Sequence, residues 1–452
     1  MVMRKNLVAS VLALTLAAWS VGGAQAQSIT QALTAAYNYA PDLASAHLAA
    51  KSSAENVALA RAGKLPVIGA SVGSTYDWSI AGGDFTDSTL STAGLSYNQT
   101  IFDNFKTEAQ IEAARAGAEA AEYQIRNTEQ NVLLAVVQAY MDVLSNRQLV
   151  ALRQENVNFY QAQLQSAKDR LDVGEGTRID VAQAEARLAQ GDATYRASQA
   201  SLEISQATFA RYVGAPPQNL DASHNYSRLI PNSLQGALSE AETGHPAIML
   251  AKAAIRAAQA GSDAASAAFG PTATVSGQIG TALSGTNALQ GISGKLGFSI
   301  TVPIYAGGAI GAGVRQANLD QIKSEVDAMS AYDQIREAVI AAWAGIQSAD
   351  AQISAATAAV SAGREVLEGT IQERDLGTST TLDVLNSQAE LTTARESLIN
   401  AQTNKVIATF SLLSSMGRLT ATNLGLPVEV KTAVQYNNAV EDVWQELRTV
   451  AE

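Results

Sequence analysis

The sequence predicts a mainly α-helical chain that also contains β structure: long coiled-coil helical hairpins and four transmembrane β-strands, arranged in a duplicated order. The first observation is an internal repeat, because Tyr97–Gly214 aligns on Ile300–Gly417 with a constant offset of 203 residues. The second is the distribution of the nine prolines, none of which falls in 67–215 or 304–426. The third is a change of apolar period inside each repeat, from two in short segments to 3.5 in long ones.

The N-terminal residues 1–26 have the pattern of a secretory signal peptide. Arg4 and Lys5 precede an apolar stretch, Leu7–Ala18, and a small-residue cleavage site follows at Ala24–Ala26. The apolar stretch is too short to span the ~30 Å of a bilayer's hydrocarbon core. We therefore expect cleavage after Ala26 and export of the mature chain.

Each repeat, 27–214 and 241–417, is expected to contain two β-strands before its helices. In four segments, apolar side chains alternate with small polar ones over ten residues or more, which is typical of membrane-spanning strands. These segments are about 67–80, 91–101, 272–283 and 292–304. The links at 81–90 and 284–291 are expected to be exposed loops. A soluble, half-buried antiparallel sheet would show the same alternation and stays an alternative.

Each pair of strands is followed by a helical hairpin, at about 103–214 with its tip at 172–180 and at about 306–417 with its tip at 375–383. Apolar residues recur every seven positions along these helices, which predicts coiled-coil packing. In the first repeat this seam consists of Val136, Val143, Val150, Val157, Leu164 and Leu171. At 1.5 Å per residue the longer helix of each hairpin would extend ~100 Å, so the molecule should be elongated.

Composition excludes several classes of function. The 452 residues include no cysteine and only three histidines, which excludes thiolate metal sites, disulfides and a lipid-modified N-terminal cysteine. The formal charge of −12 argues against a nucleic-acid partner, which requires a basic face. No Ser/His/Asp arrangement or carboxylate pair has the spacing of a catalytic site. We therefore expect no enzymatic activity, no metal and no cofactor.

Four strands cannot close a barrel, because single-chain barrels have at least eight. An open sheet edge in lipid would leave backbone groups unpaired, at several kcal/mol each. If the strands cross a membrane, several chains must share one barrel. The small polar residues of the inner face cannot fill its interior, so the expected product is an open pore that helices continue.

The tip segments Val173–Val181 and Leu376–Leu385, with the helix-initiating prolines after Ala40 and His245, resemble the TolC family of outer-membrane efflux and secretion ducts. The resemblance covers essentially the whole mature chain. It implies a homotrimer with a twelve-strand β-barrel in outer-membrane lipid, continued by an α-helical barrel across the periplasm. It also implies an equatorial band, here formed by 215–240 and 418–452. The implied partners are a periplasmic membrane-fusion adaptor and an inner-membrane ABC or RND transporter.

The resemblance also indicates a channel constriction near the second tip. Asp383 matches an aspartate of the acidic ring that narrows the channel in this family, and the second acidic position falls on Asn386. Three Asp383 side chains around an axis would repel one another and attract cations. The alternative is that Asp383 only stabilises a helix N-terminus, as Asp180 would in the first repeat.

A latch between the hairpins is the third feature that the resemblance implies. The family's linking tyrosine and arginine fall on Arg374 and Ser379, and the partner aspartate matches Asp180. These departures suggest a substitute, an Arg374–Asp180 ion pair in each chain. Arg374 also interrupts the apolar seam, so it could instead be a solvated charge at a frayed helix end.

The expected adaptor surface consists of residues at the two tips: Gly174, Thr177, Val181, Gly377, Thr380 and Val384. Each of these could alternatively do no more than form its turn. The expected function is a passive exit duct of a tripartite system, with ABC-type protein secretion slightly preferred over RND-type drug efflux. A soluble periplasmic or surface coiled-coil scaffold is the alternative from a different class.

Overall fold

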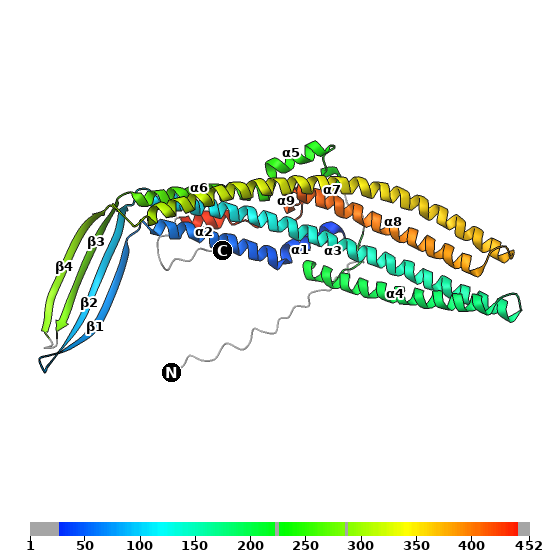
Figure 1. Cartoon of the computed structure of the whole chain (residues 1–452), viewed down its shortest axis with the longest axis horizontal. Helices are drawn as coiled ribbons and strands as arrows, with labels where there is room; N and C mark the ends of the chain where they lie inside the picture. Colours follow the sequence, from blue (N-terminus) through cyan, green and yellow to red (C-terminus); the bar gives the residue numbers. More distant parts are fainter. Residues whose placement is uncertain (1–26, 222–225, 285–287, 442–452) are drawn as a thin grey trace, which may run out of the picture.

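The computed structural model describes residues 27–221, 226–284 and 288–441, so the expected signal peptide lies outside the described residues. The molecule is elongated, with a four-stranded sheet at one end and the tips of two helical hairpins at the other (Figure 1). In the described part of the chain, no helix combines the length and the apolar character needed to cross a bilayer.

The sheet is antiparallel throughout, in the order β1-β2-β3-β4. Its strands are β1 (Val67–Ala81), β2 (Asp84–Phe102), β3 (Thr272–Ser284) and β4 (Ala288–Thr301). Residues of opposite sequence parity lie on opposite faces of the sheet, as the alternation predicts. One face is therefore apolar, and the other consists mostly of Ser, Thr, Gly and Asn.

The expectation of an exposed loop at 81–90 is wrong. Gly82 and Gly83 have φ values of 65° and 100°, and Ala81 pairs directly with Asp84. Two consecutive residues with positive φ form the tight turn whose twist matches that of a hairpin, so β2 begins at once. The second link is also shorter than expected, because β4 begins at Ala288; residues 285–287 lie outside the described residues.

The duplication is visible in the helices. α3 and α7 are each 67 residues long, and the helices that return from the tips, α4 and α8, have 36 and 35. Proline occupies the first position of both α2 and α6, where its missing N–H costs nothing. The helices are α1 (Ile29–Tyr39), α2 (Pro41–Ala62), α3 (Lys106–Asp172), α4 (Arg178–Val213), η1 (Tyr226–Leu229), α5 (Leu234–Gly244), α6 (Pro246–Ser266), η2 (Ala267–Phe269), α7 (Ala309–Asp375), α8 (Thr381–Ser415), α9 (Ala421–Leu424) and α10 (Val434–Glu441).

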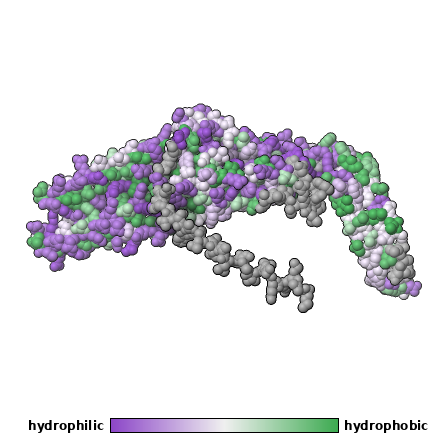
Figure 2. All heavy atoms as spheres, turned by 180° about the vertical axis from the view of Figure 1, so that it is seen from behind, coloured by the Kyte–Doolittle hydropathy of each residue, from purple (hydrophilic) through white to green (hydrophobic). Residues whose placement is uncertain are grey.

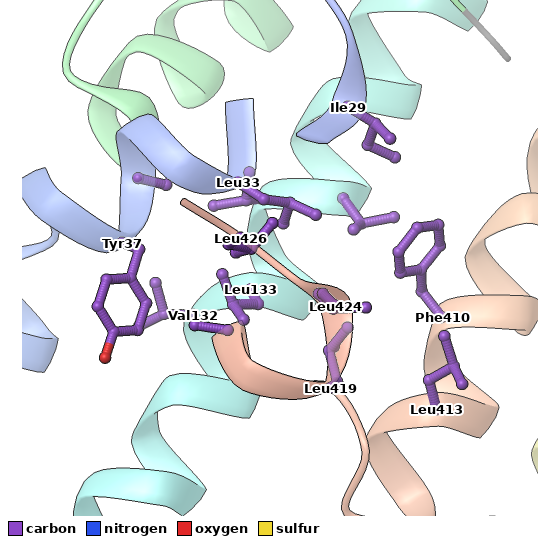
Figure 3. Close-up of a cluster of buried hydrophobic side chains, with 14 of the residues drawn as sticks. Ile29, Leu33, Tyr37, Val132, Leu133, Phe410, Leu413, Leu419, Leu424 and Leu426 are labelled. Atoms are coloured by element: carbon purple, nitrogen blue, oxygen red, sulfur yellow. The ribbon is translucent and has the colours of Figure 1, made fainter. Parts of the chain in front are cut away.

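The neighbours of α3 change along its length. Near the sheet, helices pack in the order α2, α3, α6, α7, whereas toward the tips α3 packs against α4 and α8, and α7 against α8. The main hydrophobic core lies between these two regions, at mid-molecule, where α1 and α9 are (Figure 1). Figure 3 shows its side chains at close range. It joins Leu33 of α1, Leu133 of α3, Phe410 of α8 and Leu424 of α9.

Two buried polar side chains of α3 hold the chain segments that surround this core. The Tyr140 hydroxyl donates to the carbonyl of Gln27 at 2.6 Å and accepts from the backbone N–H of Asp221 at 2.8 Å. Burial raises the pKa of Tyr140 to about 12, so it remains a donor at any ordinary pH. The Glu129 carboxylate accepts from the backbone N–H of Ala421 at 2.6 Å. Burial raises the pKa of Glu129, opposed by that N–H and by Arg126.

Two glycines have the same backbone conformation but different surroundings, so substituting each one distinguishes the cost of backbone strain from the cost of a packing clash. Gly377 at the second tip and Gly417 after α8 both have φ = 78°, but a Cβ at Gly417 would lie 2.9 Å from the Cα of His245, whereas nothing lies within 4 Å at Gly377. We expect Gly377→Ala to cost about 1–2 kcal/mol of left-handed strain. Gly417→Ala should cost more, because α6 must also move. The measurement is the thermal unfolding midpoint by circular dichroism, and equal shifts for the two variants would contradict the packing argument.

Candidate functional site at the hairpin tips

The two hairpin tips have nearly the same backbone. Five residues separate α3 from α4 and α7 from α8, and each turn contains a glycine with positive φ, Gly174 (81°) and Gly377 (78°). In the first tip the N–H of Glu175 donates to the carbonyl of Arg170 at 2.8 Å; in the second, Thr378 donates to Glu373 at 2.9 Å. Both long helices thus end at a glycine in the left-handed conformation, which glycine adopts readily because it has no Cβ.

Both return helices begin with a reciprocal cap. Thr380 Oγ1 accepts from the N–H of Asp383 at 3.2 Å, and Asp383 Oδ2 accepts from the N–H of Thr380 at 2.9 Å. Thr177 and Asp180 make the same pair of hydrogen bonds in the first repeat, at 3.1 and 3.0 Å. The alternative role of these aspartates, stabilising a helix N-terminus, is therefore confirmed for both.

Asp383 nevertheless keeps an exposed charge. Hydrogen bonds from the Thr380 hydroxyl, then the Thr380 backbone and the Ser379 hydroxyl, lower the pKa of Asp383. In the single chain the carboxylate therefore stays ionised to a lower pH than that of an ordinary aspartate. Capping and a charged ring are compatible, because the cap engages Oδ2.

The structure does not form the expected Arg374–Asp180 pair within one chain. Asp180 Oδ2 is engaged by the N–H and the hydroxyl of Thr177, at 3.0 and 2.6 Å. Arg374 instead donates to Asp375 Oδ1 through Nη2 at 2.8 Å, and to Gln163 Oε1. Arg374 is only 8% exposed, so the alternative of a solvated charge at a frayed helix end is also wrong.

Asp375 joins the two hairpins at the level where the latch was expected. Its Oδ1 atom also accepts from Nη2 of Arg170 on α3, at 2.9 Å. One carboxylate oxygen thus bridges a guanidinium from each long helix, and Gln163 adds a second contact from α3 to Arg374. The sequence contained a signal for Arg374, which interrupts the apolar seam, but none for Arg170 or Gln163, more than 200 positions away.

Asn386, expected at the constriction, takes part in a further contact between the hairpins. It is half-buried, and its Oδ1 accepts from Nη2 of Arg187 on α4 at 2.8 Å. The two expected constriction residues therefore differ in this chain: Asp383 is exposed, whereas Asn386 binds the neighbouring hairpin.

Farther from the tip, buried polar side chains join α8 to α3. Asn156 Oδ1 accepts from Gln388 Nε2 at 3.0 Å and from the Thr392 hydroxyl at 3.2 Å, and all three residues are buried. A buried amide in a coiled coil fixes the register of its helices, because any slip leaves it unsatisfied. The apolar periodicity gave no signal for this cluster.

Two ion pairs lie beside the Asn156 cluster. Arg153 meets Glu396 at 2.6 Å and Glu155 meets Arg395 at 2.8 Å, so α3 and α8 each contribute one acid and one base. Burial raises the pKa of Glu396, and Arg153 opposes that shift. The two hairpins are thus held together by polar contacts from Arg153 down to Asp375.

The expected docking residues do not form one surface. Gly174, Thr177, Gly377 and Thr380 are exposed at the tips. Val181 is half-buried against Tyr160 and its neighbours. Val384 is fully buried in a cluster with Leu367 and Leu391, so it cannot contact a docked protein in this arrangement of helices. Its apolar side chain packs α8 against α7 instead.

A four-stranded sheet with one apolar face, continued by two hairpins that meet at polar tips, defines a subunit of an outer-membrane export channel. The protein-family model described as "Outer membrane efflux protein" matches residues 32–215 and 237–418 of this chain. The chain therefore belongs to this family. The match falls once on each repeat.

Relatives agree with this assignment. The outer membrane efflux protein BepC of Brucella suis biovar 1 is 36% identical over 450 residues, covering 98% of this chain and 97% of BepC. The outer membrane protein TolC of Escherichia coli K12 is 26% identical, covering 93% and 88%. Among solved structures, the outer membrane channel CmeC of Campylobacter jejuni has a TM-score of 0.77 at 16% identity, covering 92% and 89%, and CusC has 0.76 at 20%, covering 86% and 92%.

The resemblance to TolC-family ducts and the duplicated channel fold are therefore confirmed. The chain is a transport channel of the Gram-negative outer membrane with its helices in the periplasm, and the family is not enzymatic.

A single carboxylate tests the link between the hairpins. We expect Asp375→Asn to weaken it by about 1 kcal/mol, the upper end for a partly exposed ion pair, and so to raise the open population of a two-state tip up to about fivefold. The measurement is the open fraction in single-channel recordings in planar bilayers.

The matched control for this test is Asp172→Asn. Asp172 is the equivalent exposed residue at the end of α3, 203 positions earlier. It should leave the open fraction unchanged, and an equal effect of the two substitutions would show that Asp375 acts only through its charge at the tip.

Proposed function

We propose that three copies of this chain form an outer-membrane channel that serves as the passive exit duct of a tripartite export system. The observation that supports this most directly is that the sheet and the helical layer end on the same two sides of the molecule. β1 and β4 are the edges of the sheet, and in the part of the molecule near the sheet α2 and α7 are the corresponding edges of the helical layer. Each chain is thus one open sector of a ring.

The sheet edges require partners in a membrane. In the described strands β1 and β4 each pair on one side only, and an unpaired backbone group in lipid costs several kcal/mol. Pairing β4 of one chain with β1 of the next satisfies both edges. Three chains give a barrel of twelve strands, within the range of natural barrels.

The helical edges are complementary in the same direction. α7 has an apolar stripe of Leu319, Ile322, Val326 and Met329, each more than half exposed. Their spacing of three, four and three residues is that of a coiled-coil seam. On the opposite edge, α2 exposes Leu48 and Leu59. The stripe of α7 therefore faces α2 of the next chain when β4 faces β1.

The exposed apolar face of the sheet argues against the alternative of a soluble coiled-coil scaffold. A periplasmic coiled-coil protein would need no exposed apolar sheet face, whereas here Val72, Ile292, Leu296 and Phe298 all lie on one face and are largely exposed. Such a face is stable in lipid and a liability in water.

The partners in the proposed system are a periplasmic membrane-fusion adaptor at the tips and an inner-membrane transporter behind it. The adaptor surface retains Gly174, Thr177, Gly377 and Thr380, with Val181 at its margin. Adaptor binding opens the duct only if it favours the open tip over the closed one, because a ligand shifts an equilibrium by its differential affinity. To open the tip, adaptor binding must break the polar contacts between the two hairpins.

Relatives support both kinds of export. The alkaline protease secretion protein AprF is 25% identical over 387 residues, which favours the protein secretion expected from the sequence. The fusaric acid resistance protein FusA (29% identical over 238 residues) favours small-molecule efflux, and BepC is an efflux protein. Deleting the gene and measuring exported protein and drug susceptibility in parallel distinguishes the two.

Substituting aspartate into the apolar stripe of α7 tests the proposed assembly. We expect the purified wild-type chain to be trimeric in detergent and to conduct in bilayers. Leu319→Asp combined with Met329→Asp should reduce the oligomer to monomers, because two carboxylates would be buried without partners. Gln334→Asp, an exposed position off the stripe, is the control. A wild-type monomer that stays soluble without detergent would overturn the proposal.

The proposed ring of Asp383 is tested by ion selectivity. We expect Asp383→Asn to reduce the preference for cations, measured as the reversal potential in a salt gradient, while Asp180→Asn, with the same cap, leaves it unchanged. Hydrogen bonds from Thr380 and Ser379 lower the pKa of Asp383, whereas repulsion among the three carboxylates of the ring raises it. Cation selectivity should be lost as the pH falls through the pKa of the ring, because protonation removes its charge. Thr380→Val should move that loss to higher pH. Equal selectivity of wild type and Asp383→Asn would exclude the ring.

A further inference from the structure

The apolar face of the sheet has a hollow that the packing of the chain does not explain. It measures about 490 Å³ and crosses all four strands, with Ile68, Leu95, Ile279 and Leu296 among its walls. Hydrophobic residues are exposed widely over the sheet, whereas the helical part of the surface is mixed (Figure 2).

Two glycines form the floor of this hollow. Gly277 on β3 is opposite Tyr97 and Leu296, and Gly294 on β4 is opposite Ile279, so both lie on the apolar face. They are diagonal neighbours, and together they remove two adjacent side chains from a part of the face where the paired residues, Tyr97, Ile279 and Leu296, are bulky. The backbone of β3 and β4 is therefore exposed at the bottom of the hollow.

Neither glycine is required by the chain itself. Both have negative φ, since neither is among the residues with positive φ. A Cβ at Gly277 would lie 3.6 Å from Tyr97 Cβ and 3.7 Å from Leu296 Cδ2, and one at Gly294 would lie 3.7 Å from the carbonyl of Gln278. These are ordinary contacts, so a Cβ atom is accommodated at both positions.

We propose that this hollow is a binding site for one acyl chain of a bilayer phospholipid. The face belongs to the strands of an outer-membrane protein, so lipid covers it, and the hollow is continuous with the exposed apolar surface around it. An apolar void that stays empty loses its dispersion contacts, and a flexible hydrocarbon chain restores them. Leu296, 90% exposed in the isolated chain, gains the most from such a contact.

The position of the hollow indicates which part of the lipid enters it. Gly277 is five residues from the start of β3, and Tyr97 is five residues from the end of β2, so the hollow lies in the half of the sheet nearer the helices. The Tyr97 hydroxyl donates to Gln99 Oε1, and Gln99 Nε2 donates to the carbonyl of Lys64 at 3.1 Å. These polar groups mark the end toward the periplasm, where the ester region of a lipid in the periplasm-facing leaflet would lie.

The experiment compares the wild-type oligomer with Gly277→Leu combined with Gly294→Leu, which fills the hollow with hydrocarbon from the protein. Native mass spectrometry after purification in mild detergent counts the retained phospholipids. We expect about one per chain for the wild type and a loss of most of it in the filled variant. The matched control is Ser74→Leu, which adds the same side chain to the same face away from the hollow, opposite Ser91.

A second measurement keeps the test valid if the filled variant assembles poorly. Dioleoyl phosphatidylethanolamine is added to delipidated oligomer, and the thermal unfolding midpoint is recorded. A ligand that binds only the folded state raises the midpoint, so the wild type and Ser74→Leu should rise and the filled variant should not. Equal lipid retention by all three proteins, or an equal rise of the midpoint, would overturn the site.

Discussion

The constraint on which this structure depends is that a peptide group in lipid must find its hydrogen-bond partner within protein. Four strands per chain satisfy only their inner ladders, from β1–β2 to β3–β4. The outer edges of β1 and β4 stay unpaired in the single chain. The helical layer also has an unpartnered edge, because the apolar stripe of α7 is exposed. Assembly therefore follows from the sheet, and the helices continue an arrangement that the strands impose.

The sequence was informative where one short-range signal decides the structure. Alternation located the strands, the absence of proline located the long helical segments, and the offset of 203 located the duplication. It failed at 81–90, where two glycines make a turn short enough for β2 to continue through the polar residues around Asp84 and Asp87. A polar segment was interpreted as a loop, although a strand that extends beyond the hydrocarbon has no need of apolar residues.

Prediction of the site was limited by distance along the chain. Capping by Asp180 and Asp383 depends on neighbours three residues away and was foreseen as an alternative. The contacts of Arg374 with Gln163 and of Asn156 with Gln388 join residues more than 200 positions apart, and no pattern in a single sequence pairs them. The burial of Val384 could not be predicted for the same reason. Its position in the tip motif does not indicate that α7 packs against its side chain.

The unequal burial of the two long helices has a consequence for the assembly. α3 and α7 have the same length, yet α3 has twenty buried residues in one chain and α7 only five. The mid-molecule core holds α3 about halfway along its length, between Ile125 and Val143. α7 reaches the same core with Val339, and with Ile335, Trp343 and Ile346 at its margin. Elsewhere α7 buries few residues against its own chain, so in the proposed ring the packing of the second hairpin depends on the neighbouring subunit.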